Sequence, residues 1–225
     1  MTCFTLNGKA VISQSLPSTR LSEVLRSEMG LSGTKIGCNA GDCGACSVLL
    51  DEELICSCLT TIAQVDGAKV TSIEGLNAEN IISNLQESFL AHGAAQCGIC
   101  TPGMMVAAHA LLLKNPTPNR CDVEDALGGV LCRCTGYGKI IDAVLAVNSD
   151  RPINSLPRVG CSVGMPIRHL DGQSKVDASL VFGDDAAPQD SIMVRVIRSP
   201  HHYASFKIGD KAAFLSKHPG ILAVL

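Results

Sequence analysis

The sequence lacks the features that mark several large classes of protein. Its longest strongly apolar run extends from Gly103 to Leu113 and ends at Lys114, well short of the ~20 residues that a bilayer span needs. The N-terminus has no basic region followed by an apolar stretch, so no secretory signal is visible. Lys and Arg together number 18 against 21 Asp and Glu, and this small negative charge argues against nucleic acid as the main partner. We therefore expect a cytoplasmic protein without a membrane span.

Cysteine, by contrast, is abundant and unevenly distributed. The chain has 12 cysteines, and none follows Cys161. A reducing compartment does not sustain a framework of disulfides, so this density indicates metal ligands or redox chemistry. The same asymmetry separates a cysteine-rich region from a cysteine-free one, and the Pro- and Gly-containing segment 148–164 has the composition of a linker between them.

Two patterns of secondary structure precede that linker. Residues 1–76 favour strands with one helix, beginning with a hairpin about Asn7-Gly8, a strong two-residue turn signal. Residues 77–147 favour four helices, one of which follows Thr101-Pro102 and is apolar almost all round. The fold class expected from these patterns is α+β, with a mainly stranded unit followed by a helical one.

The first metal-binding pattern is Cys38-x4-Cys43-x2-Cys46, followed by Cys58. This spacing is typical of plant-type [2Fe–2S] proteins. The glycines within the run allow the backbone to fold tightly around a cluster and to aim N–H groups at its sulfurs. A four-thiolate zinc site and inert buried thiols are the alternatives. Cys56 would share a strand face with Cys58, and we interpret it as a neighbour of the ligands.

The second pattern pairs Cys97-x2-Cys100 with Cys132-x-Cys134. Each pair lies just before a predicted helix, where free N–H groups and the helix dipole favour anionic thiolates. The spacing alone fits zinc, a redox disulfide or a second iron–sulfur cluster. Beside a ferredoxin-type run, the second cluster is the better interpretation.

Three stretches of the sequence resemble the iron–sulfur module of the xanthine oxidase/aldehyde oxidoreductase family of molybdenum hydroxylases. The resemblance covers about residues 3–147, and the motifs occur in the family's order. Residues 164–182 and Arg198-Ser199-Pro200-His201 resemble the opening of the family's molybdopterin-binding subunit. The three stretches are Cys38-Asn39-Ala40-Gly41-Asp42-Cys43-Gly44-Ala45-Cys46, Gln96-Cys97-Gly98-Ile99-Cys100-Thr101-Pro102-Gly103 and Cys132-Arg133-Cys134-Thr135-Gly136-Tyr137.

The resemblance implies a specific fold and a specific set of site residues. It implies a β-grasp ferredoxin-like domain at 1–76, a four-helix domain at 77–147, and the incomplete beginning of an α/β hammerhead-like domain at 165–225. Gln96 and Cys134 match positions that contact the pterin of the molybdenum cofactor in relatives. The implied ligands of two [2Fe–2S] clusters are Cys38, Cys43, Cys46 and Cys58, and then Cys97, Cys100, Cys132 and Cys134.

The implied activity is that of an electron-transfer subunit. In the family, an aldehyde or N-heteroaromatic carbon is hydroxylated with oxygen from water, and electrons leave the molybdenum one at a time through the two clusters to a flavin or an external acceptor. The implied partners are a large molybdopterin-binding subunit, which holds most of the molybdenum cofactor, and, where a flavin is the acceptor, an FAD-binding subunit.

The chain also departs from a complete enzyme. It has neither a G-x-G-x-x-G run nor a Walker loop, so nothing in it indicates binding of FAD, NAD or a nucleotide. The family's substrate pocket and catalytic base lie downstream of the residues present, and we therefore assign no catalytic residue. A free-standing ferredoxin-like carrier and a zinc-stabilised binding module are the alternative functions, although a carrier needs neither the linker nor the cysteine-free tail.

Overall fold

Two hairpins with tight turns supply four of the five strands of the sheet. In the computed structural model, which describes residues 1–77, 80–149, 156–165, 167–188 and 190–225, β1 (Thr2–Leu6) pairs antiparallel with β2 (Lys9–Ser13). The turn between them is Asn7-Gly8, both with positive φ (50° and 77°), as the sequence predicts. The second hairpin joins β3 (Ser47–Leu50) to β4 (Glu53–Cys56). Its turn residues, Asp51 and Glu52, also have positive φ.

The strands form one mixed sheet with a helical segment packed against it. The order is β2-β1-β5-β3-β4, in which β5 (Lys69–Thr71) runs parallel to β1 and antiparallel to β3. A short helix, α1 (Leu21–Glu23), continues as a π-helical turn, η1 (Val24–Glu28), and a 3₁₀ turn, η2 (Ile62–Val65), precedes β5. Leu25 from the helix and Val48 and Val70 from the sheet are buried in one hydrophobic core. The predicted α+β class is confirmed at the level of a mixed sheet with helices.

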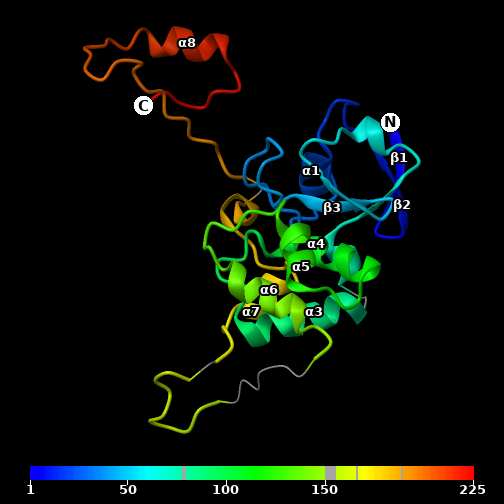
Figure 1. Cartoon of the computed structure of the whole chain (residues 1–225). Coiled ribbons are helices and arrows are strands. Elements are labelled where there is room, and N and C mark those ends of the chain that lie inside the picture. The colour runs from blue at the N-terminus through cyan, green and yellow to red at the C-terminus, as the bar shows by residue number, and fades with distance from the viewer. Residues whose placement is uncertain (78–79, 150–155, 166, 189) are drawn as a thin grey trace. The chain divides into compact units, whose positions relative to one another are not determined.

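The helical part surrounds one almost entirely buried helix. Its elements are α2 (Ile73–Leu76), α3 (Asn80–His92), α4 (Thr101–Lys114), α5 (Arg120–Leu127) and α6 (Tyr137–Leu145). Helix α4 contacts α3 and α5 on one side and β3 on the other (Figure 1). This position explains why α4 is apolar around its whole circumference, and it joins the helical part to the sheet.

The compact part of the chain includes residues that follow the predicted linker. It comprises Met1–Ala186 and therefore includes α7 (Gly172–Val176) and the 3₁₀ turn η3 (Gly183–Ala186). Val176 and Ala178 are buried in the same core as α3, α4 and α6, so this segment packs against the helices that precede the predicted linker. Residues 150–155 of the predicted linker lie outside the described residues.

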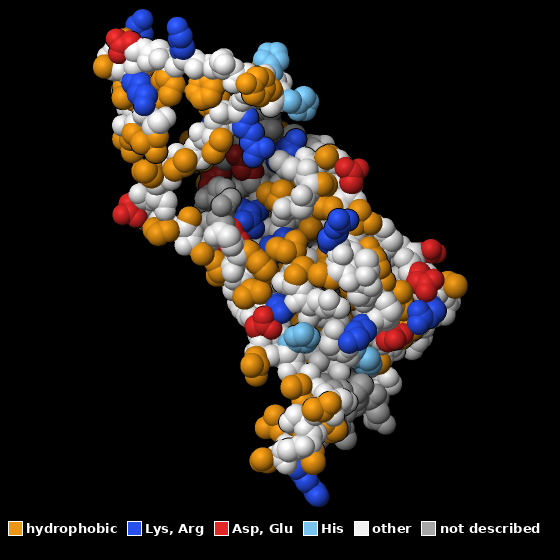
Figure 2. Space-filling view, turned by 90° about the vertical axis from the view of Figure 1, so that its left-hand side faces the viewer, with side chains coloured by type: hydrophobic (Ala, Val, Ile, Leu, Met, Phe, Trp, Pro, Cys, Tyr) orange, Lys and Arg blue, Asp and Glu red, His pale blue; other side chains and the backbone are white. Residues whose placement is uncertain are grey.

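Residues Ala187–Leu225 form a separate small unit. Its regular element among the described residues is α8 (Lys211–Lys217), and no strand is present there. Its large apolar side chains, such as Ile197, Tyr203 and Phe206, are at least 80% exposed, and the space-filling view shows hydrophobic side chains at its surface (Figure 2). None of the helices in the described part of the chain is long and apolar enough to span a membrane.

Candidate metal centres

The first four predicted ligands lie together where the loop before β3 meets the end of β4. Cys38, Cys43 and Cys46 come from the loop that follows η1, and Cys58 comes two residues after β4 ends. The thiols of Cys38 and Cys43 contact one another, as do those of Cys46 and Cys58. The structure therefore brings these four residues together as two pairs.

Backbone N–H groups point at the sulfurs of this group. The N–H groups of Ala40 and Cys43 donate to Cys38 Sγ at 3.3 and 3.4 Å, and the N–H of Cys58 donates to Cys46 Sγ at 3.4 Å. The two donors at Cys38 lower the pKa of its thiol to about 7. Because such donors stabilise negative charge on sulfur, the loop suits thiolate ligands of an anionic cluster.

A fifth thiol, that of Cys56, lies beside the same group. It is half-buried, donates to the carbonyl oxygen of Gly41 at 3.9 Å and approaches Cys46. Burial raises the pKa of Cys56, and burial together with Cys46 raises the pKa of Cys58 to about 11. Both thiols therefore lie beside Cys46, although Cys58 lies in the turn after β4 and not, as the i, i+2 spacing predicts, on a strand with Cys56. By contrast, Cys3, Cys121 and Cys161 are exposed.

The other four predicted ligands gather at the starts of α4 and α6. Cys97 contacts Cys134, and Cys100, the residue before α4, contacts Cys132. Burial raises the pKa of Cys100 to about 12, whereas the backbone N–H of Cys97 lowers the pKa of Cys134. The chain thus holds a second group of two thiol pairs.

The arrangement in pairs bears on the kind of metal that each group fits. No three Cys, His, Asp or Glu side chains in the described part of the chain are placed so that they could hold a single metal ion. A [2Fe–2S] cluster takes four thiolates, two on each iron. Each group offers four thiols with backbone N–H groups directed at them, which is the donor set that such a cluster takes.

Of the two predicted pterin contacts, Gln96 lies at the surface next to Cys97, and Cys134 is a half-buried member of the second group. Gln96 is exposed, and its Nε2 would lie 3.6 Å from a Cβ placed on Gly136, two residues after Cys134. Sequence reasoning did not single out Tyr137, whose hydroxyl oxygen accepts a hydrogen bond from the N–H of Cys132 at 2.7 Å. This hydrogen bond holds the loop that carries Cys132 and Cys134. The feature of the sequence that could have indicated this role is the position of Tyr137 directly after Thr135-Gly136.

A main-chain contact connects the two groups of thiols. The N–H of Leu131 donates to the carbonyl oxygen of Cys43 at 2.9 Å, so a residue next to Cys132 touches a residue of the first group. Gly44 has φ +65°, and a Cβ there would lie 2.1 Å from the carbonyl oxygen of Gly129. A Cβ on Gly103 would similarly lie 2.6 Å from the carbonyl oxygen of Gly44. Gly44 and Gly103 therefore permit the backbones of the two loops to approach closely. The spacing of the cysteines does not reveal this approach.

Comparison with known proteins agrees with this geometry. Residues 4–71 match the family model described as a 2Fe-2S iron-sulfur cluster binding domain, and residues 72–145 match that described as a [2Fe-2S] binding domain. The chain is 45% identical over 146 residues to a probable xanthine dehydrogenase subunit from Bacillus subtilis, covering 65% of this chain and 84% of that protein. The chain belongs to the molybdenum hydroxylase family. Within that family it is the electron-transfer iron–sulfur module of an oxidoreductase.

Other members of the family extend the comparison. The nicotinate dehydrogenase small FeS subunit of Eubacterium barkeri is 44% identical over 139 residues, covering 62% of this module and 88% of that subunit. The aldehyde oxidoreductase of Megalodesulfovibrio gigas is 36% identical over 98% of this chain, which spans 26% of that enzyme. The crystal structure of the aldehyde oxidoreductase of Desulfovibrio desulfuricans superposes with a TM-score of 0.77 at 35% identity, covering 84% of this chain and 22% of that one.

Proposed function

We propose that this iron–sulfur module carries two [2Fe–2S] clusters. The first would be held by Cys38, Cys43, Cys46 and Cys58, and the second by Cys97, Cys100, Cys132 and Cys134. The observation that carries the proposal is the gathering of eight thiols into two groups of two pairs each. The proposed domain order is a β-grasp ferredoxin-like domain followed by a four-helix domain, and the buried helix α4 joins them.

The protein's own contribution is to hold the two sites close together. The clusters would supply one-electron carriers between a two-electron centre and its acceptor. The loop 37–46 orients its thiols by backbone hydrogen bonds, while burial of Cys58 and Cys100 keeps water from one side of each site. The N–H of Leu131 donates a hydrogen bond to the carbonyl oxygen of Cys43, a residue of the first site. Because Leu131 directly precedes Cys132 of the second site, this one hydrogen bond connects the two sites. An electron would therefore pass between the two sites within this chain.

The proposed partner is a large molybdopterin-binding chain in the cytoplasm. Gln96 is exposed and Cys134 is half-buried, so a pterin held by that chain could reach both. Residues 187–225 expose large apolar side chains, a feature that marks surfaces which associate with other protein. We infer that the substrate is an aldehyde or an N-heteroaromatic compound and that an FAD-binding subunit or an external acceptor receives the electrons.

The metal content of the purified protein tests the assignment of the sites. We expect four iron and four acid-labile sulfur atoms per chain, with two distinct EPR signals after reduction. Two signals are expected because exposure and hydrogen bonding to sulfur tune each cluster, and the two groups differ in both. A colourless protein with stoichiometric zinc would contradict the proposal.

The exposed tail leads to a prediction about the chain expressed without its partner. Protease should remove parts of 187–225 and leave a folded core that ends near Ala186, because the tail has few buried side chains. Copurification with a large molybdenum-containing chain should protect the tail, whereas a free-standing ferredoxin would show no such protection. Mass spectrometry of the protected fragment makes the measurement. A full-length chain that resists protease on its own would contradict the expectation.

A further inference from the structure

Residues 167–186, which we call the strap, lie against the helical part of the module. Arg168 pairs with Glu87 of α3 at 2.8 Å, and Asn77 Nδ2 donates to the carbonyl oxygen of Asp177 at 3.0 Å. Val176 is fully buried in the helical core. The strap is therefore anchored by apolar burial at one end.

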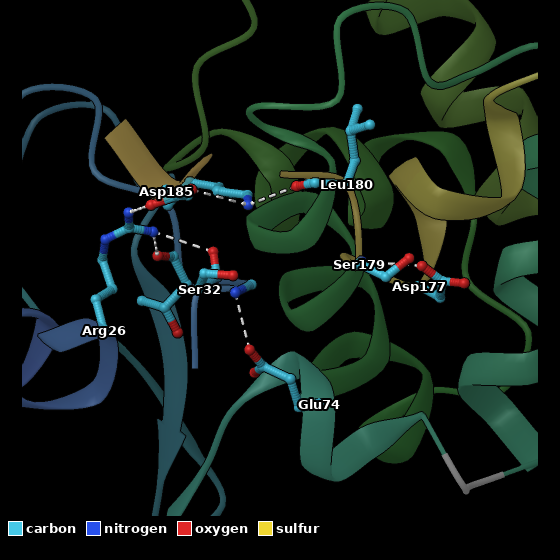
Figure 3. Close-up of polar contacts among 10 residues, drawn as sticks. Arg26, Ser32, Glu74, Asp177, Ser179, Leu180 and Asp185 are labelled. Atoms are coloured by element: carbon cyan, nitrogen blue, oxygen red, sulfur yellow. Dashed lines mark hydrogen bonds and ion pairs between the residues drawn. The ribbon is translucent and has the colours of Figure 1, made fainter. Parts of the chain in front are cut away.

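The same strap reaches the sheet domain at its other end. Lys35 Nζ donates to the carbonyl oxygen of Leu180 at 3.2 Å and lies 4.9 Å from the centre of the Phe182 ring. Asp185 pairs with Arg26 and lies 3.9 Å from Lys35. Figure 3 shows Arg26 and Asp185 directed at one another, with the strap running from Asp177 through Leu180 to Asp185. The strap thus bridges the sheet domain and the helical domain.

Charge explains why this end of the strap is held. The side chain of Lys35 is 4% exposed, and a buried cation is costly unless a carboxylate and hydrogen bonds compensate for its lost hydration. Arg26 is fixed nearby by the carbonyl oxygens of Ser32 and Thr34, at 3.0 and 2.9 Å. The two cations repel one another. Burial lowers the pKa of Lys35, and the attraction of Asp185 opposes that effect. Asp185 therefore compensates two like charges that the sheet domain presents.

The strap also borders both cysteine loops. Ile36, two residues before Cys38, and Ile99, directly before Cys100, line the same cavity of about 380 Å³ as Phe182. A Cβ on Gly98 would lie 2.9 Å from Lys175 Cγ and 3.3 Å from Phe182 Cζ. The strap therefore touches the second cysteine loop and borders the residues next to the first.

We propose that the strap is a clamp that holds the two cysteine-bearing domains as one rigid unit, with Asp185 locking it onto Arg26 and Lys35. The surface formed by these two cations and by Asn77 and Glu87 is thus a docking surface, and its occupant is a segment of this same chain. The inference rests on the proposed function in one respect only, which is that the two cysteine loops hold the iron–sulfur clusters. The clamp fixes the separation of those loops and lines the cavity that Ile36 and Ile99 border.

Trypsin provides a direct test on the full-length chain, because the strap holds two of its sites, the exposed Arg168 and the buried Lys175. Lys175 is 7% exposed and lies in α7, so cleavage after it requires the strap to detach. Arg195 is exposed in the separate unit and serves as an internal control. We expect Asp185→Asn to accelerate cleavage after Lys175 by about tenfold, with cleavage after Arg195 unchanged. A tenfold change in the opening equilibrium corresponds to about 1.4 kcal/mol.

Matched variants distinguish loss of the Asp185 ion pairs from a general loss of structure. Asp190→Asn removes an exposed acid outside the strap and should leave cleavage after Lys175 unchanged, and Asp185→Glu should restore much of the protection. Lys35→Met, which keeps the aliphatic stem, should accelerate cleavage, and combining it with Asp185→Asn should add less than the sum of the two effects. Lys139 lies in α6, so cleavage after it reports unfolding of the whole domain.

The outcomes distinguish this inference from the proposed function. The same order of cleavage rates is expected with and without bound iron, provided that the domain is folded, so a failure to find two clusters would not affect the test. Equal cleavage after Lys175 in the parent chain and in both Asp185→Asn and Lys35→Met would overturn the clamp. Acceleration that appears only together with cleavage after Lys139 would do so as well.

Discussion

Replacing Cys58 by serine is expected to halve the iron content, from four atoms per chain to two, and to abolish one of the two EPR signals. Cys58 is 2% exposed, and its thiol contacts that of Cys46. The N–H of Gly41 also donates toward its sulfur. Iron–sulfur clusters of this type are held by four thiolates, so a hydroxyl in this place leaves one iron without its proper ligand. Iron analysis and EPR of the reduced protein make the measurement.

Cys56→Ser is the matched control for this prediction. Cys56 is close enough to Cys46 to be a rival ligand, but its thiol is directed to the carbonyl oxygen of Gly41. We therefore expect the Cys56→Ser protein to keep four irons and both signals. A protein that loses the first cluster on Cys56→Ser and keeps it on Cys58→Ser would show that Cys56 is the ligand.

Substitution of Gly44 by alanine is expected to destabilise the module by about 2–5 kcal/mol. Its left-handed backbone costs an L-residue about 1–2 kcal/mol, and inserting a methyl group into a filled space costs about 1–3 kcal/mol more. The added Cβ would meet the carbonyl oxygen of Gly129 at 2.1 Å, so the backbone of one loop must move. The hydrogen bond between Leu131 and Cys43 lies next to this contact, so we also expect loss of iron. Urea unfolding followed by circular dichroism measures the first effect.

Gly67→Ala is the control that separates the cost of the left-handed backbone from the cost of the steric clash. Gly67 has a similar positive φ of +74°, but no atom lies within 4 Å of a Cβ placed on it. It should therefore cost only the roughly 1–2 kcal/mol of the left-handed backbone and leave the iron content unchanged. Equal destabilisation by Gly44→Ala and Gly67→Ala would mean that the two loops yield without strain and that their close approach is unimportant.

Local features of the fold could be predicted from the sequence, because their causes are local. Asn7-Gly8 forms the expected turn since both residues tolerate positive φ. The buried helix after Thr101-Pro102 begins where expected, although Cys100, and not Thr101, is the residue that precedes it. The structure brings the cysteines of each pattern near one another, and their role as cluster ligands stays a prediction.

Contacts between distant segments could not be predicted in this way. Cys43 and Leu131 meet through main-chain atoms, which leave no signature of residue type apart from the glycines around them. The strap was missed for a related reason. Its anchors, Arg26, Lys35 and Asp185, are charged residues far apart in the sequence, and only the folded chain shows that they compensate one another. Composition marks a linker at 148–164, whereas the packing of residues 167–186 against the core becomes visible only in the folded chain.

The close approach of Gly44 to the backbone of Gly129 and to Gly103 limits how the module can be engineered. A chimera that joins residues 1–71 of this chain to the helical part of another protein would bring together two surfaces whose backbones here meet without room for a Cβ. A bulkier residue on either side would force the halves apart, even though all eight cysteines were retained. The halves are therefore not interchangeable cassettes, and grafts should carry 37–46, 98–103 and 129–134 together.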